Sequence, residues 1–459
     1  MAHYLSGRML AVVIAAVITG GLLPLTACGE ADMGSPALPP QASDLTHKVS
    51  PRGTPATGAQ WQKHGVLHMD GERGSLTVPA LLLFISGGWD YSNAQMPYLV
   101  GIPEKRRLLL SAEVGAGPVH TVLVSSDDGG ATWTQPRWMH TDAAGSPDFT
   151  CVTGLTYLGG GKLVASSDTY WFSRDWGQTW ADPVPVPVGA EGKPMWGWDP
   201  LLVDRDPATG KVVRLAECRY KENGTFDTAG YFSQAGVHFS CDEGKTWSKE
   251  IEVPQWRGVS EVALVRARSG DLVAACRTDN PPQFLGLQND QYSGLATSVS
   301  HDDGKSWSEL NRLYWWGRHH PDMVVLPNGD IVMTYVVRNG YTDDRNGFPR
   351  FGVEAVISHD NGNTWDLDHK YILASWTAKI RHTWWGAAQS TSTVVLPSGA
   401  LLTAFGTGLR NVPEDTICEM DVALVRWRPS RGRVSSESAI SRAPFDSDLH
   451  NRFDLESAR

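Results

Sequence analysis

The chain has 459 residues, among them 47 glycines, 28 prolines and 19 tryptophans. This length suits one large domain or two ordinary ones, and the many turn formers and bulky aromatic side chains are typical of an all-β protein. The formal net charge is −10 and the sequence has no basic run. Nucleic acid and anionic membrane surfaces are therefore excluded as expected partners.

The first 27 residues have the pattern of a bacterial lipoprotein signal peptide. Arg8 precedes an apolar run over residues 9–23, and residues 25–28 form a Leu-Thr-Ala-Cys box. We expect lipidation of Cys28, which places the protein outside the cytoplasm and holds it to a membrane only through lipid. An ordinary signal peptide with a chance cysteine is the alternative. A transmembrane anchor is disfavoured because the apolar run is shorter than the roughly 20 residues that span a bilayer.

Two further segments are expected to lie outside the folded domain. Residues 28–58 are rich in proline, alanine, serine and glycine and predict a flexible tether, and residues 430–459 predict a disordered polar tail. The domain itself is then expected over residues 59–429. Beyond Cys28 an odd number of cysteines remains and no C-x-x-C spacing occurs, so a Cys218–Cys241 bridge and free thiols both stay open.

One octapeptide pattern, Ser-x-Asp-x-Gly-x-Thr/Ser-Trp, occurs five times. Its aspartates are Asp128, Asp175, Asp242, Asp302 and Asp360, at intervals of 47, 67, 60 and 58 residues by subtraction. The Asp can accept N–H bonds of a turn, the Gly can adopt a positive φ, and the Trp can fill the space below. A motif that returns at such intervals indicates a repeat architecture.

A second repeat accompanies the first: an apolar strand, a tight turn and another apolar strand. It occupies residues 96–113, 151–168, 199–218, 261–277, 322–335 and 392–405. Six units predict a six-bladed β-propeller of four-stranded antiparallel blades, in which the octapeptide turns join strands three and four of the first five blades. Residues 76–86 are expected to close the ring by pairing with the last blade. A β-sandwich or solenoid explains the six-fold count less well.

Function is expected at the mouth of the propeller where the inner strands begin. Carboxylates, imidazoles, guanidinium groups and tryptophans gather in the segments that enter these strands and in the loops that leave the second strands. This mixture suits a sugar, because aromatic faces stack on a pyranose, charged groups hold its substituents, and paired acids hydrolyse it. The alternative for any single residue is a rim group bonded to its neighbour.

Five such turns on six blades resemble the sialidase (neuraminidase) superfamily over roughly residues 61–428. In that family an arginine triad binds the substrate carboxylate, a Tyr–Glu couple supplies the nucleophile, and a loop Asp is the acid/base. The resemblance implies that Glu261, which opens the fourth inner strand, is the family's glutamate. It implies triad roles for Arg277 and for Arg350, with Arg345 competing for the latter place.

The sequence departs from the family pattern at two places. Residues 95–97 are Gln-Met-Pro where the family has an Arg-Ile-Pro-like motif, and no tyrosine lies near Ser390. A sialic acid carboxylate would thereby lose a bidentate partner, which is among the stronger contacts available to it. The family's covalent route also lacks its usual nucleophile. These departures leave a glycosidase as the expectation and keep its sugar open.

The candidate site residues follow from these considerations. Catalytic roles are expected for Glu261 as base or nucleophile, for Asp148 or Asp199 as the acid, and for His320 as a tuned proton donor. Substrate binding is expected at Gln95, Arg277, His319, Asp322, Arg350 and Trp385. No metal is expected, because adjacent histidines in a strand point to opposite faces. Two tryptophan pairs, Trp315 with Trp316 and Trp384 with Trp385, fit either stacking platforms or core plugs.

The expected function is that of an extracytoplasmic glycoside hydrolase that resembles exo-sialidases and cleaves a terminal sugar, sialic acid or another sugar, acidic or not, from a glycan. We expect a monomer that needs no cofactor. One alternative is a non-catalytic propeller that binds carbohydrate or protein. Another is a uronate lyase that uses His320 or a tyrosine as its base.

Overall fold

The computed structural model describes residues 62–65, 79–88, 94–115, 120–147, 151–189, 191–226, 228–285, 290–341, 343–378, 387–407 and 420–429. The predicted leader, tether and tail lie outside these residues, and so do Cys28, Asp148 and Trp385. Within the described part, no helix is long and apolar enough to cross a membrane.

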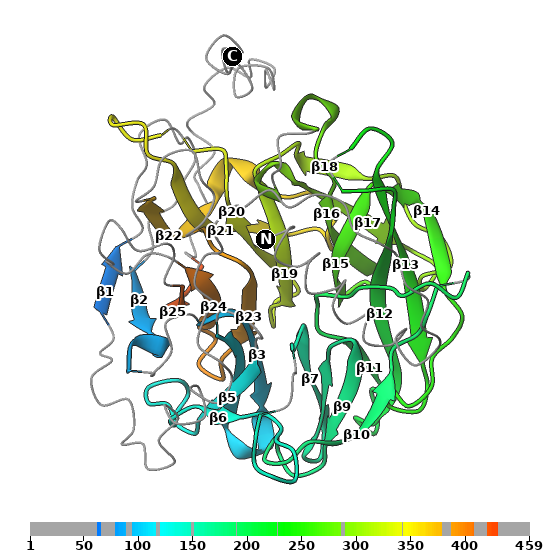
Figure 1. The fold of residues 1–459 in the computed structure, drawn as a ribbon, viewed down its shortest axis with the longest axis vertical. Coiled ribbons are helices and arrows are strands. Elements are labelled where there is room, and N and C mark those ends of the chain that lie inside the picture. The colour runs from blue at the N-terminus through cyan, green and yellow to red at the C-terminus, as the bar shows by residue number, and fades with distance from the viewer. Residues whose placement is uncertain are drawn as a thin grey trace, which may run out of the picture.

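Six antiparallel sheets follow one another around a common centre, as predicted (Figure 1). Blade one contains β3 (Ala94–Ile102), β4 (Arg107–Val114), β5 (His120–Ser126) and β6 (Arg137–Trp138). Blade two contains β7 (Gly154–Gly159), β8 (Lys162–Ser166), β9 (Thr169–Ser173) and β10 (Ala181–Pro185). Blade three contains β11 (Leu202–Arg205), β12 (Val212–Asn223), β13 (Phe232–Ser240) and β14 (Ile251–Arg257).

The remaining blades continue the order round the ring. Blade four contains β15 (Val259–Arg266), β16 (Leu272–Thr278), β17 (Gly294–Ser300) and β18 (Asn311–Tyr314). Blade five contains β19 (Arg318–Val325), β20 (Ile331–Val337), β21 (Arg350–Ser358) and β22 (Tyr371–Thr377). Blade six contains β23 (Thr391–Val395), β24 (Leu401–Thr407), β25 (Asp421–Trp427), β2 (Pro79–Phe84) and β1 (Gln62–Gly65).

The ring is closed by strands from both ends of the domain. The early strand β2 pairs antiparallel with β25, with Leu82 opposite Val425, which confirms the predicted closing strand. Near the axis, the inner strands of blades one and six also meet, where Leu99 N donates to Ser392 Oγ at 2.9 Å. Because a propeller has no covalent closure, these contacts hold the first and last blades together.

Each octapeptide turn follows the third strand of its blade, as predicted. In the first copy, Asp128 Oδ1 accepts hydrogen bonds from Ser126 Oγ at 2.8 Å and from Thr132 N at 2.9 Å. Asp128 Oδ2 accepts a hydrogen bond from Thr132 Oγ1 at 2.6 Å. The glycine also meets the neighbouring blade: Gly362 has a φ of +87°, and a Cβ there would lie 2.6 Å from Val273 of blade four. These turns therefore attach each blade to the preceding one.

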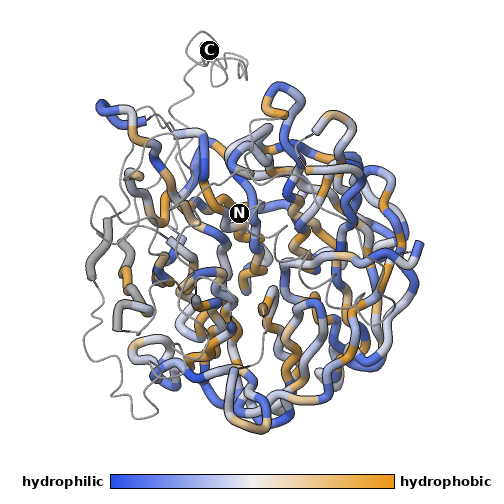
Figure 2. The backbone as a smooth tube through the Cα atoms, in the orientation of Figure 1, coloured by the Kyte–Doolittle hydropathy of each residue, from blue (hydrophilic) through white to orange (hydrophobic). Residues whose placement is uncertain are grey.

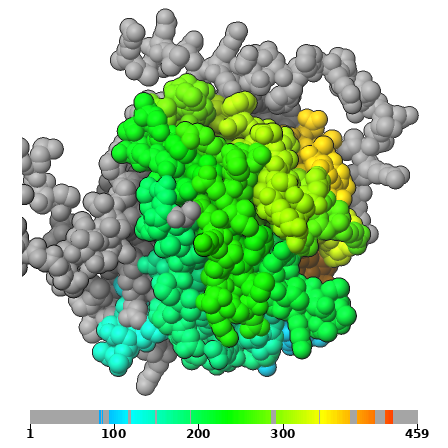
Figure 3. Space-filling model, turned by 90° about the vertical axis from the view of Figure 1, so that its right-hand side faces the viewer, coloured from blue at the N-terminus to red at the C-terminus, as the bar shows by residue number. Residues whose placement is uncertain are grey.

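The core lies between successive blades. Hydrophobic residues concentrate in the strands, whereas the connecting loops are mostly hydrophilic (Figure 2). Four of the octapeptide tryptophans are buried in this core: Trp133, Trp180, Trp307 and Trp365. In the side view, the green to yellow segments, which belong to blades three, four and five, lie next to one another (Figure 3). The four cysteines in the described residues, Cys151, Cys218, Cys241 and Cys276, are free thiols, which decides the open question of a Cys218–Cys241 bridge.

A buried ion cluster fixes the start of β19. Arg318 Nε donates to Glu354 Oε2 at 3.0 Å across β20, and the Tyr341 hydroxyl donates to Glu354 Oε1 at 2.8 Å. Burial by itself would raise the pKa of Glu354, but the charges of Arg318 and Lys370 overcome it and lower this pKa to about 2. The ionised carboxylate thereby anchors Arg318, the residue just before His319 and His320.

We predict that Glu354→Gln destabilises the domain by about 3–5 kcal/mol, because it leaves the Arg318 guanidinium buried without its ionic partner. The wild-type contribution is complete above pH 4.5, the ordinary pKa of the group, and is lost as the pH falls toward about 2. Urea unfolding at pH 3 and pH 6 should show a smaller pH difference for the variant. Glu309→Gln, at an exposed glutamate, is the control and should behave like the wild type.

Candidate active site

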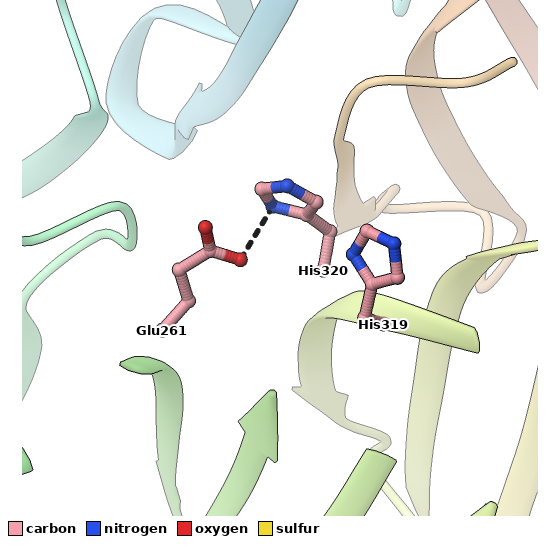
Figure 4. A group of neighbouring side chains, drawn as sticks. All are labelled: Glu261, His319 and His320. Carbon is pink, nitrogen blue, oxygen red and sulfur yellow. Dashed lines mark ion pairs between the residues drawn. The ribbon is translucent and has the colours of Figure 1, made fainter. Parts of the chain in front are cut away.

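Three inner strands carry a β-bulge where they begin, at the mouth of the propeller. In β15 the pairing passes from Val259 to Val262 while the partner strand advances by only two residues, and in β19 it passes likewise from His319 to Asp322. A third bulge lies in β3. Bulges change the direction of the side chains that they contain. Here they turn Glu261 and His320, from adjacent blades, toward each other (Figure 4).

Glu261 is the centre of a buried polar group. Arg277 Nη1 donates to Glu261 Oε1 at 2.8 Å, and His320 Nδ1 lies 2.9 Å from Glu261 Oε2. The same Arg277 nitrogen lies 3.4 Å from His320 Nε2, and Arg277 Nη2 donates to Ser293 Oγ at 3.1 Å. Only 5% of Glu261 is exposed. The adjacent guanidinium charge of Arg277 favours the ionised carboxylate.

His320 is held as a neutral imidazole. Burial lowers its pKa, and the nearby charges of Arg277 and Arg338 lower it further, whereas Glu261 acts in the opposite direction. The contacts suit one tautomer, in which Nδ1–H donates to Glu261 and Nε2 accepts from Arg277. His320 also has a φ of +49°, a conformation that costs of order 1–3 kcal/mol for a residue other than glycine. Such strain is concentrated at functional sites.

The bulge also brings His319 to the same side as His320, with ring centroids 5.0 Å apart. The alternation used to argue against a metal is therefore wrong at this position. Glu261, His319 and His320 offer ligand atoms within 4.8 Å of one another, and these donor types suit Zn²⁺. However, Arg277 and His320 already bind both oxygens of Glu261, and the guanidinium charge opposes a cation there. We assign the group as a hydrogen-bonded cluster.

Two further buried carboxyl groups lie at the mouth: Asp199 interacts electrostatically with Glu261 and also with the second group, Asp322. Burial raises the pKa of Asp199 well above its ordinary value, and the charges of Glu261 and Asp322 raise it further, against a bond from the Val262 N–H. Burial raises the pKa of Asp322 to about 7, although Thr393 N donates to its Oδ2 at 2.5 Å. The mouth therefore combines an arginine-paired carboxylate with two carboxyl groups whose pKa values are raised by burial.

The structure sorts the other predicted site residues. Glu261, Arg277, His319 and His320 come together, with Asp199 and Asp322 close by. Gln95 lies beside the bulge of β3, opposite Glu113. Arg350 begins β21, the third strand of its blade, close to Asp344. Asp148 and Trp385 fall outside the described residues.

Sequence reasoning missed three buried polar neighbours. Ser293 links Arg277 to Asn280, accepting from the arginine and donating to Asn280 Oδ1 at 3.3 Å. Tyr98 donates to Trp198 O at 3.0 Å, and burial raises its pKa, as do the charges of Asp199 and Glu113. Ser293 precedes a third strand, outside the segments searched, and Tyr98 lies in an apolar stretch that predicts only core.

Comparison with known proteins agrees with this architecture. Residues 156–372 match the family described as a BNR repeat-like domain, from β7 to β22. No curated protein matches the chain. A Dyadobacter fermentans protein of unknown function is similar at 15% identity, with 81% of this chain and 99% of that chain covered and a TM-score of 0.53.

Other solved structures are more distant. The Hadza microbial sialidase Hz136 shares 15% identity over 73% of this chain and 66% of its own, with a TM-score of 0.49. Penicillium chrysogenum alpha-L-arabinanase shares 16% identity over 73% of this chain and 94% of its own, with a TM-score of 0.47. The predicted six-bladed fold is confirmed, and residues 156–372 are similar to the BNR repeat-like family.

The turn that enters β19 gives a test of how the site is positioned. Gly317 has a φ of +79°, and a Cβ there would lie 1.8 Å from Asn339 O. We predict that Gly317→Ala destabilises the protein by several kcal/mol more than Gly210→Ala. Gly210 has a similar φ of +69° with nothing within 4 Å of the added carbon, so it reports the backbone strain alone, about 1–2 kcal/mol. Equal chemical-denaturation midpoints for the two variants would contradict this positioning role.

Proposed function

We propose that the protein is a glycoside hydrolase that acts at this mouth, with Glu261 as the catalytic carboxylate and Asp199 as the proton donor. One observation carries the proposal: Glu261 accepts a hydrogen bond from Arg277 and lies beside His320, whereas burial raises the pKa of the neighbouring Asp199 well above its ordinary value. Glycoside hydrolysis needs one ionised and one protonated carboxyl group on either side of the scissile bond. Environments that separate two carboxyl pKa values in this way assign the two roles.

The reaction follows from these roles. The Asp199 proton passes to the glycosidic oxygen as the bond from that oxygen to the anomeric carbon breaks. The Glu261 carboxylate either attacks the anomeric carbon or takes a proton from the water that does so. In the first case, a water then attacks the anomeric carbon, its proton goes to the Asp199 carboxylate, and the bond from the sugar to Glu261 breaks. The anomer of the first-formed product distinguishes these routes.

The proposed substrate is a terminal acidic sugar, sialic acid or another, removed from a glycan. The guanidinium groups of Arg277 and Arg338 both act on His320, so positive charge faces the place where a substrate carboxylate would bind. Gln95 stands where the family has an arginine, which favours an acidic sugar other than sialic acid. Lipid attachment at Cys28 outside the cytoplasm is part of the proposal and rests on sequence alone.

The test is hydrolysis of aryl glycosides by the purified protein. An aryl sialoside, aryl glucuronides and galacturonides, and neutral aryl glycosides form the panel, with released phenol as the signal. Turnover of an acidic member supports the proposal. Silence throughout would overturn it and favour a glycan-binding propeller, while an unsaturated product absorbing in the ultraviolet would indicate a lyase.

We predict that Glu261→Gln lowers kcat by roughly 10²–10⁴-fold, because the amide has neither the charge nor the basicity of the carboxylate. The amide has nearly the same shape, so the variant should stay folded, although the loss of the ionic partner of Arg277 lowers its unfolding midpoint. Glu309→Gln, at an exposed position, is the matched control and should retain full activity. Wild-type kcat in the Glu261 variant would remove this residue from the mechanism.

The pH dependence tests the acid. Because burial raises the pKa of Asp199, this acid keeps its proton to a higher pH than an ordinary aspartic acid, and kcat/KM should fall as the pH rises through that pKa. Asp199→Asn should abolish this alkaline decline and lower the rate most for poor leaving groups, which need a proton. An unchanged alkaline limb in the variant would transfer the role to another group, of which Asp322 is the first candidate.

A further inference from the structure

The tryptophan pair at the junction of blades four and five divides into two environments. Trp316 is 8% exposed, and its ring centroid lies 5.4 Å from that of Phe284 and 6.3 Å from that of Tyr292. Trp315 is 53% exposed. Among the described residues, it is the one Phe, Tyr or Trp side chain in the exposed class. Trp316 is therefore a core plug, and Trp315 needs another explanation.

Trp315 is supported by a cation. The Arg312 guanidinium carbon Cζ lies 4.8 Å from the Trp315 ring centroid, and Arg312 Nη1 donates to Thr278 Oγ1 at 3.3 Å. Asp279 acts electrostatically on Arg312. A guanidinium held in this way restrains the orientation of the indole ring. A cation–π interaction at such an exposed site contributes about 0.5–1 kcal/mol.

Two chain segments connect Trp315 and Arg312 to the proposed active site. Thr278, which binds Arg312, directly follows Arg277, the partner of Glu261. Trp316 directly follows Trp315, packs on Tyr292 and precedes the β19 strand that carries His320. Tyr292 in turn precedes Ser293, which binds Arg277. Because β18 is the outer strand of blade four and β16 lies next to the inner one, Arg312 and Trp315 lie farther from the axis than Arg277.

We propose that Trp315 and Arg312 form a second sugar subsite, which binds a pyranose of the glycan other than the one whose bond is cleaved. This inference rests on the proposed function for its substrate. The exposed indole offers a rigid flat surface for the C–H face of a sugar, and Arg312 offers N–H donors to its hydroxyl or carboxylate groups. The substrate class is then an oligosaccharide that extends over blade four, with an acidic unit favoured at Arg312.

The test measures binding and turnover separately. Oligosialic acids and oligogalacturonates of one to five units are titrated calorimetrically into the full-length Glu261→Gln protein, with and without Trp315→Ala. We expect Trp315→Ala to weaken binding of the longer members about 3- to 10-fold and to leave the single sugar unaffected. Trp315→Phe should restore most of the affinity. In the active protein, the kcat/KM ratio of a trisaccharide to an aryl monosaccharide should fall by a similar factor.

Trp176→Ala provides a matched control. This tryptophan also carries a cation, with Lys105 Nζ 4.9 Å from its ring centroid, but it belongs to the second octapeptide turn, at the opposite face. It should change neither affinity nor the ratio. The subsite would be overturned if Trp315→Ala left the affinity for every oligosaccharide unchanged. It would also be overturned if the variant lost the same factor in affinity for the single sugar and for the five-unit oligosaccharide. If no glycoside is hydrolysed, the proposed function fails, whereas the binding series still decides the subsite.

Discussion

The proposed site depends on the six blades keeping fixed positions around the axis, because its residues come from different blades. Asp199 comes from blade three, Glu261 from blade four and His320 from blade five. Hydrogen bonds between inner strands connect them: the Val262 N–H binds Asp199, and the Thr393 N–H binds Asp322. The ring stays closed through the pairing of β2 with β25. A blade that shifted by one residue would exchange the inward and outward side chains of its inner strand and dismantle the site.

Electrostatics at the mouth follow from burial next to unequal partners. Glu261 has an arginine and an imidazole N–H as donors, so it can remain charged although it is almost inaccessible to water. Asp199 and Asp322 have mainly backbone N–H partners, and burial makes their protonated forms more favourable. Arg318 and Glu354 form another buried ion pair. In this pair each charge is neutralised by the other, and the pair holds the start of β19 in place. Burial and buried charge in this propeller thus position the proposed site and raise the pKa values of two of its carboxyl groups.

Much of the site was predictable as a set but not as a geometry. The inner-strand starts and second-strand ends identified Glu261, Arg277 and His320, because the topology of a propeller brings those positions to one mouth. The bulges were not predictable, since a bulge adds one residue without a composition signal of its own. Alternation therefore separated His319 from His320, whereas the structure places both rings on one side. Likewise, neighbouring residues Trp315 and Trp316 have the same chemistry, and only the packing of Phe284 and Tyr292 decides which of the two is buried.

The sequence by itself determined the fold, the number of blades and the closing strand. Each octapeptide turn is stabilised by hydrogen bonds that span at most four residues, as between Asp128 and Thr132, so its structure is encoded locally and its repetition counts the blades. The contacts of the proposed site span far longer separations, such as the 59 residues by subtraction between Glu261 and His320. Their distances, tautomer and protonation depend on how bulged strands of neighbouring blades meet and how completely they exclude water. Only the tertiary structure decided those properties, because no local segment contains both partners.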